Sequence, residues 1–129
     1  MKRTIFLIFL ALVVGLVWFG GCRPGGQEIE IRAAPIHEVR ISIAESFPPQ
    51  VFVYIKGGLA DGCTTFHDLT IDRSGNTITI KVSIQQPKNT PCAQVYGYFE
   101  KNVNLGSQFV AKQTYNLSVN DYKTTFVMP

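Results

Sequence analysis

The stretch that decides the fold is residues 69–84, LTIDRSGNTITIKVSI. Its centre, Arg73 to Asn76, is rich in turn-forming residues. After this turn an apolar residue occupies every second position: Ile78, Ile80, Val82 and Ile84. A period of two is typical of a β-strand with one buried face. Since Leu69 and Ile71 show the same alternation before the turn, the stretch predicts a β-hairpin.

Further strands are expected on both sides of this hairpin. Runs with a period of two, or with apolar residues on both faces, occupy residues 29–33, 39–43, 51–55, 94–103, 115–119 and 122–126. No helical period follows Phe19 in the sequence. Strands repeated about every ten residues predict an all-β chain folded as an antiparallel β-sandwich of seven or eight strands. A closed barrel is the alternative.

Aromatic residues in these strands allow two interpretations. Phe52 and Tyr54 alternate with the aliphatic residues of strand 51–55, which predicts a central strand covered on both faces. Tyr96 and Tyr98 fall in the next wide strand. Such residues either fill the core or form an exposed platform for a ligand. The core interpretation is favoured, because the domain has few other large side chains.

The N-terminal segment has the order of a secretory signal. Lys2 and Arg3 form a short positive region, and Ile5 to Phe19 is an apolar run broken only by Gly15. Gly20 and Gly21 then precede Cys22. Charge, apolar core and small residues in this order predict export from the cytoplasm.

Phe19-Gly20-Gly21-Cys22 resembles the lipobox of prokaryotic lipoproteins, although Phe19 stands where leucine is usual. The resemblance implies that residues 1–21 are removed and that Cys22 carries lipid. Residues 22–35 would then form a tether, with a possible edge strand, and residues 36–129 the β-sandwich domain. The expected location is the cell membrane, lipid-anchored and facing the extracytoplasmic side. An uncleaved helix over 4–21, about 27 Å long against a core of about 30 Å, is the alternative, followed by ordinary secretion.

Charge argues against a nucleic-acid partner. The chain has twelve basic and nine acidic residues, a formal net charge of +3. Without Lys2 and Arg3 the excess falls to +1. A near-neutral domain lacks the clustered positive surface that phosphate neutralisation needs.

Two cysteines remain when Cys22 is assigned to the lipid. In an oxidising compartment Cys63 and Cys92 are expected to form a disulfide between two loops at one end of the sandwich. The alternative is a metal site in which both thiolates and His67 are joined by His37 or Asp68. The loops around the cysteines are the predicted recognition surface, with these ligand-facing residues: Asp61, Gly62, Thr64, Lys88 and Asn89.

Catalytic chemistry has little support in the sequence. His67 and Asp68 are adjacent on a strand and should point to opposite faces, so the carboxylate is badly placed to orient the imidazole. No G-x-S-x-G stretch is present to mark a serine nucleophile. No catalytic residue, cofactor or bound metal is therefore expected.

Two stretches resemble known families. The closing hairpin, Tyr115 to Phe126, resembles the last two strands of bacterial immunoglobulin-like modules. The stretch from Gly58 through Arg73-Ser74-Gly75-Asn76-Thr77 to Pro91-Cys92 is similar to small uncharacterised prokaryotic lipoproteins. The resemblance implies location and an immunoglobulin-like fold but no active site. Together these observations predict a lipid-anchored binding or accessory module without catalytic activity and with a possible protein partner. An extracellular protease inhibitor, or a small metal-binding protein, is the alternative.

Overall fold

A computed structural model of the chain describes Gly21 and residues 25–129. Residues 1–20 and 22–24 lie outside this description, and with them the predicted signal segment up to Gly20 and the predicted lipidation at Cys22. The described residues contain eight strands: β1 (Ile29–Ala33), β2 (Ile36–Ala44), β3 (Gln50–Leu59), β4 (Thr65–Ser74), β5 (Thr77–Pro87), β6 (Gly97–Gly106), β7 (Thr114–Val119) and β8 (Tyr122–Val127). In this part of the chain, no helix has the length and apolar character needed to cross a membrane.

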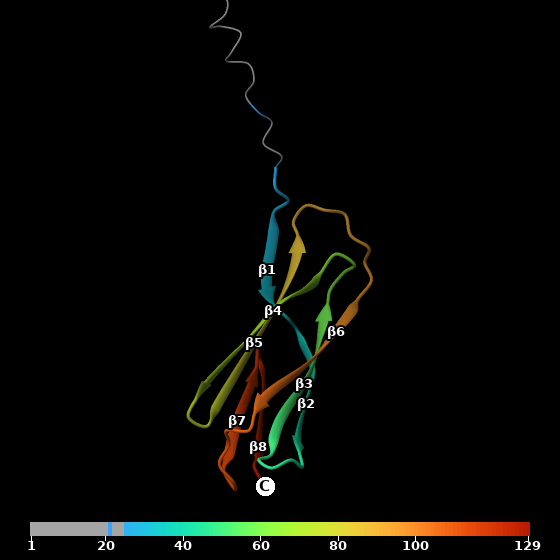
Figure 1. The fold of residues 1–129 in the computed structure, drawn as a ribbon. Helices are drawn as coiled ribbons and strands as arrows, with labels where there is room; N and C mark the ends of the chain where they lie inside the picture. Colours follow the sequence, from blue (N-terminus) through green and yellow to red (C-terminus); the bar gives the residue numbers. More distant parts are fainter. Residues whose placement is uncertain (1–20, 22–24) are drawn as a thin grey trace, which may run out of the picture.

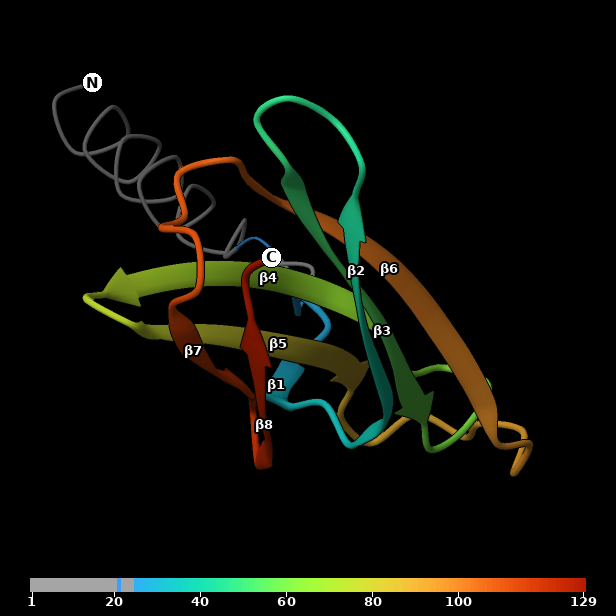
Figure 2. The same ribbon diagram turned by 90° about the horizontal axis from the view of Figure 1, so that it is seen from below.

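The strands form two sheets that pack as a β-sandwich (Figures 1 and 2). One sheet has the order β1-β5-β7-β8, with β4 on the other side of β5, and the second has the order β2-β3-β6. The predicted all-β sandwich is thereby confirmed. One strand pair departs from the antiparallel expectation. β5 and β7 run parallel, with Thr77 opposite Asn116 at one end of the pairing and Ile80 opposite Val119 at the other.

The core lies between the sheets and follows the alternation seen in the sequence. On β5, every second residue is fully or nearly fully buried, and the inner side chains of β3 meet it from the opposite sheet. Aromatic rings close the two ends, with Phe66 against Phe99 at one end and Tyr115 stacked on Phe126 at the other. The largest fully buried side chains are Ile55, Ile78, Ile80, Ile84, Leu117, Val51, Val53, Val82 and Val119.

Both predicted hairpins are confirmed. The β4–β5 turn has Ser74 opposite Thr77, and Gly75 adopts a φ of +58°, a conformation that favours glycine. In the β7–β8 hairpin, Val119 lies opposite Tyr122. Asn120 has a φ of +49° in this turn, as expected for a residue type that tolerates positive φ.

The Asn120 side chain completes the five-stranded sheet. β7 pairs with the first half of β5 and β1 with the second half, and the gap between them falls at Val82. There the Val82 N–H donates to Asn120 Oδ1 at 2.9 Å. Asn120 Nδ2 donates to the carbonyl oxygens of Val82 at 2.9 Å and of Ala34 at 2.8 Å. The carboxamide therefore stands in for a peptide group between the two strands.

Two expectations about the second sheet need correction. β3 is central, but only its inner face is covered, because no described layer packs on the far side of this three-stranded sheet (Figure 2). The strand expected over 94–103 instead begins at Gly97. Gln94 to Tyr96 belong to the preceding loop, which the disulfide at Cys92 holds.

We expect Asn120→Gly to lower the free energy of unfolding by about 2 kcal/mol, because the Val82 N–H and the Ala34 carbonyl lose their partner. Glycine tolerates the positive φ of this turn, so the loss reports the side chain alone. Urea denaturation followed by circular dichroism measures it. The control is Asn116→Ala, an exposed asparagine on β7, with an expected change within about 0.5 kcal/mol. Equal stability of Asn120→Gly and the wild type would contradict the bridging role.

Candidate functional site

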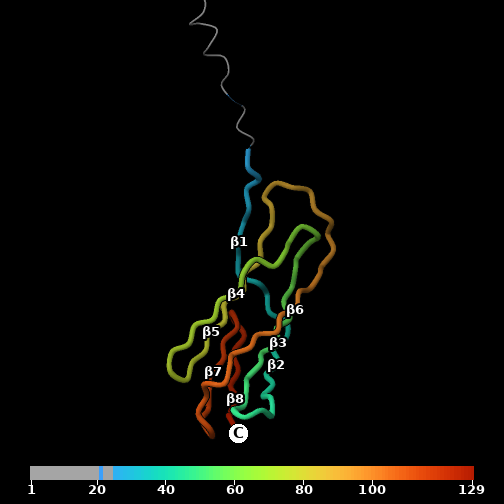
Figure 3. Tube along the Cα trace, viewed as in Figure 1, coloured from blue at the N-terminus to red at the C-terminus, as the bar shows by residue number. Residues whose placement is uncertain are grey.

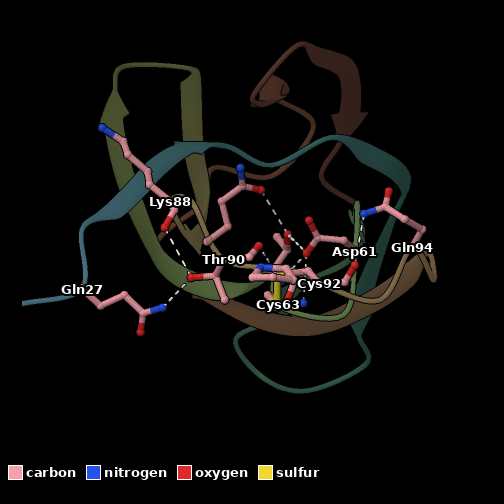
Figure 4. Close-up of a disulfide and its surroundings, with 10 residues drawn as sticks. Gln27, Asp61, Cys63, Lys88, Thr90, Cys92 and Gln94 are labelled. Carbon is pink, nitrogen blue, oxygen red and sulfur yellow. Dashed lines mark hydrogen bonds between the residues drawn. A yellow bond between two sulfur atoms is a disulfide. The ribbon is translucent and has the colours of Figure 1, made fainter.

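The predicted disulfide is present. Cys63 and Cys92 are joined, with Cα atoms 5.6 Å apart and a sequence separation of 29 residues. The bond links the β3–β4 loop to the β5–β6 loop at one end of the sandwich (Figure 4). In the chain-entropy description a closed loop of this size stabilises a domain by roughly 3.6 kcal/mol.

Asp61 organises the loop that carries Cys63. Its Oδ1 atom accepts hydrogen bonds from the Cys63 N–H at 3.0 Å, the Thr64 N–H at 2.9 Å and the Thr64 hydroxyl at 2.8 Å. The hydrogen bond from the Thr64 hydroxyl lowers the pKa of this carboxyl below its ordinary value of 3.8, and the bond from the Cys63 N–H lowers it further by a smaller amount. The ionised carboxylate is therefore a structural acceptor for its own loop.

Gly62 and Lys88, which are also predicted to face a ligand, make contacts within the molecule. Gly62 donates its N–H to the Ala93 carbonyl at 2.8 Å, which ties the two loops together. Lys88 Nζ forms an ion pair with Glu28 at 3.0 Å. Asn89 adopts a positive φ of 55° in the turn after β5. The ligand-facing role of these loops stays a prediction.

The disulfide-linked loops lie at the end where the chain enters the domain. Gln27 Nε2 donates to the Thr90 hydroxyl at 2.7 Å, and the Lys88 N–H donates to the Glu28 carbonyl at 2.8 Å. Figures 1 and 3 show both loops beside the start of β1, with the β2–β3 loop at the opposite end. Gln27 and Glu28 are thus held against the disulfide end before β1 begins.

The alternative metal site is not assembled in this arrangement. Asp61, Cys63 and Cys92 bring one ligand atom each within 4.8 Å of one another, but both sulfur atoms are consumed by the disulfide. His67 lies in a β-bulge of β4, and its Nδ1 is 3.0 Å from Gln85 Oε1. The thiolates that would bind a soft metal are absent from the described site.

A surface of a different kind lies on the outer side of the three-stranded sheet. Tyr96 and Tyr98 are 48% and 54% exposed, and Phe52 and Tyr54 are half-buried. The core interpretation of these four residues is therefore wrong, because all four lie on the outer side of the sheet and Tyr96 and Tyr98 are exposed there. We call the surface made by His37, Phe52, Tyr54, Tyr96 and Tyr98 the aromatic face.

His37 joins this face through an irregularity in β2. Ile36 pairs with Gly57 and Glu38 with Lys56, so His37 is an extra residue in a β-bulge. Its Nε2 lies 2.5 Å from the Tyr96 hydroxyl. The rings of His37, Tyr96 and Tyr98 meet edge to face, with centroids 5.4 to 5.8 Å apart. The pattern of β2 gave no signal for this bulge.

Two neighbouring glycines make room for aromatic rings on the two sides of β3. A Cβ atom at Gly58 would lie 1.9 Å from the Tyr96 hydroxyl oxygen and 2.7 Å from His37 Nε2. At Gly57, on the core side, it would lie 2.1 Å from the Phe99 ring. A side chain at Gly58 would therefore displace the His37–Tyr96 pair.

Cations and a carboxylate complete the aromatic face. The Arg40 guanidinium carbon lies 4.2 Å from the centroid of the Tyr54 ring, and Lys56 Nζ lies 4.5 Å from that of Tyr98. The Tyr54 hydroxyl donates to Glu100 at 2.5 Å. This hydrogen bond raises the pKa of Tyr54 above 10.0, so the phenol stays protonated and remains a donor.

The outer side of the five-stranded sheet is built from different residue types. It carries a shallow depression of about 520 Å³ over β5, β7 and β8. Hydroxyl and amide side chains dominate its lining, with Lys123 as the charged group; the lining residues are Thr77, Thr79, Asn116, Leu117, Ser118, Lys123, Thr124 and Thr125. No aromatic residue lines this described depression.

Fold and disulfide together define a small, disulfide-linked β-sandwich domain. The chain belongs to the ORF11 beta-sandwich domain family, whose pattern matches residues 53–128. That match runs from the middle of β3 to the end of the described fold and includes both disulfide cysteines.

Similar proteins are known from Herpetosiphon aurantiacus. The "uncharacterized 10.2 kDa protein in HgiCIIM 5'region" is 41% identical over 86 residues, which cover 67% of this chain and 90% of that protein. The "uncharacterized 10.2 kDa protein in HgiBIM 5'region" is 41% identical over 76 residues, 59% of this chain and 92% of that protein. No solved structure matches. The relatives are small and uncharacterised, as the resemblance implied.

The lowered pKa of Asp61 predicts acid sensitivity. Because the folded-state pKa lies below the ordinary 3.8, ionised Asp61 stabilises the fold above that pH, and this contribution is lost as pH falls through the folded-state pKa. Asp61→Asn keeps an oxygen acceptor without the charge. We expect the wild type to be more stable than this variant at pH 7 and the difference to shrink below about pH 4. Thermal melts from pH 2 to pH 7 measure it. The exposed Asp121→Asn serves as control, and a difference that grows at low pH would contradict the assignment.

Proposed function

We propose that this protein is an exported, lipid-anchored binding module that uses the aromatic face as its binding surface. The exposed ring cluster of His37, Tyr96 and Tyr98 carries the binding part of the proposal. Export and anchorage are supported by the signal-like segment ending in Phe19-Gly20-Gly21-Cys22. The Cys63–Cys92 disulfide agrees with an oxidising compartment.

Anchorage at Cys22 would fix how the domain faces its surroundings. Five residues separate Cys22 from Glu28, which is held by Lys88 beside the disulfide loops. Such a segment spans at most about 20 Å. The disulfide end would then lie near the membrane, while the aromatic face would extend along the side of the sandwich and remain accessible from the cell exterior.

Binding is a better use of this surface than catalysis. The ionisable side chains at its centre are engaged with one another: Arg40 pairs with Glu38 at 2.9 Å, and Glu100 accepts from Tyr54. Away from this face, the His67 ring contacts Gln85. An amide carries no negative charge to stabilise the imidazolium that a general-base histidine becomes, as the carboxylate of a Ser-His-Asp triad does. Exposed aromatic rings, in contrast, provide contact area and orientation for a ligand.

If the protein is anchored through Cys22, replacing this cysteine should abolish lipidation. We expect Cys22→Ser to abolish incorporation of labelled fatty acid and to stop removal of the signal segment, because a serine oxygen replaces the thiol that receives the lipid. Gel mobility and labelling measure both effects. The control is Cys63→Ser, which leaves Cys22 intact and should stay labelled. Labelling of the Cys22→Ser variant would contradict lipidation at this residue.

The binding proposal predicts sensitivity to the exposed tyrosines. Full-length protein in a detergent without a sugar headgroup is incubated with lipid-extracted envelope fragments of the producing cells, so that insertion of the anchor does not contribute. We expect Tyr96→Ala/Tyr98→Ala to weaken sedimentation with the fragments at least tenfold, or about 1.4 kcal/mol.

Tyr122→Ala is the matched control, because this tyrosine is also exposed but lies on β8 of the other sheet. Its binding should equal that of the wild type. Equal thermal melts of all three proteins establish that the variants are folded. If the double variant binds as well as the wild type, the aromatic face is not the binding surface.

A further inference from the structure

The large apolar side chains on the outer face of the three-stranded sheet are aromatic rather than aliphatic. Strand register places every second residue of the three strands on this side, from Glu38 to Ala44 on β2, from Gln50 to Gly58 on β3 and from Tyr98 to Asn104 on β6. Among these described positions there is no valine, leucine, isoleucine or methionine. Contact surfaces between proteins commonly bury methionine together with aromatic side chains at their centre. The composition therefore favours flat rings as the apolar recognition element.

The charges of this face cancel. Glu38 and Glu100 oppose Arg40 and Lys56, and each group contacts a neighbour. Arg40 contacts Glu38 and the Tyr54 ring, Glu100 accepts from Tyr54, and Lys56 lies over the Tyr98 ring. A charged ligand would meet no net opposite charge here, so charge complementarity selects a neutral one.

Hydrogen-bonding groups accompany the rings at the Phe52–Tyr54 end of this face, where Asn102 lies opposite Tyr54 and Asn104 and Ser42 lie opposite Phe52. Asn102 and Asn104 are exposed on β6, and Ser42 is exposed on β2, the strand on the other side of β3. Carboxamides and hydroxyls both donate and accept hydrogen bonds, as the hydroxyl groups of a sugar do. The surface therefore combines ring faces with two-way hydrogen bonding, and both suit a polyhydroxylated ring.

We propose that the aromatic face binds a neutral glycan of the cell envelope, with sugar rings placed against Tyr96 and Tyr98. This inference rests on the proposed binding function and names its ligand class. The C–H groups on one side of a pyranose ring carry a weak positive potential that complements the negative face of an aromatic ring. Lys56 lies over Tyr98 through a weak exposed contact on a flexible stem, so a sugar can displace it.

The His37–Tyr96 hydrogen bond has a positioning role in this site. It holds Tyr96, which precedes β6, against the sheet at Gly58. Because the two tyrosine rings meet at an interplanar angle of 73°, they present surfaces in two directions. This geometry suits a chain of several sugars, whose successive rings turn relative to one another, better than a single sugar.

The test treats the same lipid-extracted envelope fragments in two ways before the full-length protein is added. Periodate cleaves the vicinal diols of sugars, and a broad-specificity protease removes protein. We expect periodate to weaken binding at least tenfold and protease to leave it within twofold. Loss of binding after protease, but not after periodate, would overturn the glycan assignment and identify a protein partner.

Competition tests the neutrality of the ligand. Glycans released from the fragments are divided by anion exchange into a neutral and an anionic fraction. The neutral fraction should compete for the wild type, whereas competition by the anionic fraction alone would overturn the proposal. Tyr98→Phe keeps the ring and should bind within about threefold of the wild type, while Tyr98→Ala should lose at least tenfold.

The two proposals fail in different ways. If Tyr96→Ala/Tyr98→Ala binds untreated fragments as strongly as the wild type, the binding surface itself is wrong. If the tyrosines matter but periodate does not, the surface stands and the glycan is wrong. Tyr122→Ala accompanies each measurement as the control on the opposite sheet.

Discussion

The structure depends on how Val82 is hydrogen-bonded. β5 must pair with β7 along its first half and with β1 along its second, and these two strands meet it in opposite directions. A break at the centre of a sheet would leave buried peptide groups without partners, which costs more free energy than most single contacts return. The Asn120 carboxamide removes this cost with a donor and an acceptor in the geometry of a peptide bond. The left-handed conformation of the β7–β8 turn places it there.

That bridge explains how a short chain can support a thin second sheet. The five-stranded sheet is continuous from β4 to β8, so β3 can pack its inner side chains against a regular surface. The three-stranded sheet then needs only one buried face, and the side chains on its outer face do not have to pack against another layer. Gly57 and Gly58 weaken β3 as a strand, because glycine loses the most backbone entropy on folding. Gly57 serves the core by admitting Phe99, whereas Gly58 admits only the exposed His37–Tyr96 pair.

Much of this architecture follows from local pattern. Alternation predicted the strands, the turn residues predicted both hairpins, and the cysteine count predicted the disulfide. The aromatic face could not be assigned in the same way, because β3 carries apolar residues on both sides. Period alone does not tell which side meets water; that depends on how many layers the fold has. The bulge at His37 and the Asn120 bridge are equally non-local, since the latter joins residues 86 positions apart in the sequence.

The contrast between the disulfide-linked loops and the aromatic face is energetic. At the disulfide end, Asp61, Gly62 and Lys88 each satisfy a partner within the domain, so a ligand there would have to compete with contacts that hold the loops in place. On the aromatic face, Tyr96 and Tyr98 are about half exposed and contribute little to the core. Exposed rings lower the solubility of the protein, and the fold does not require them. Gly58, which leaves room for the His37–Tyr96 pair, costs backbone entropy on folding. A ligand that covers these rings offsets both costs, which makes this face the better candidate for recognition.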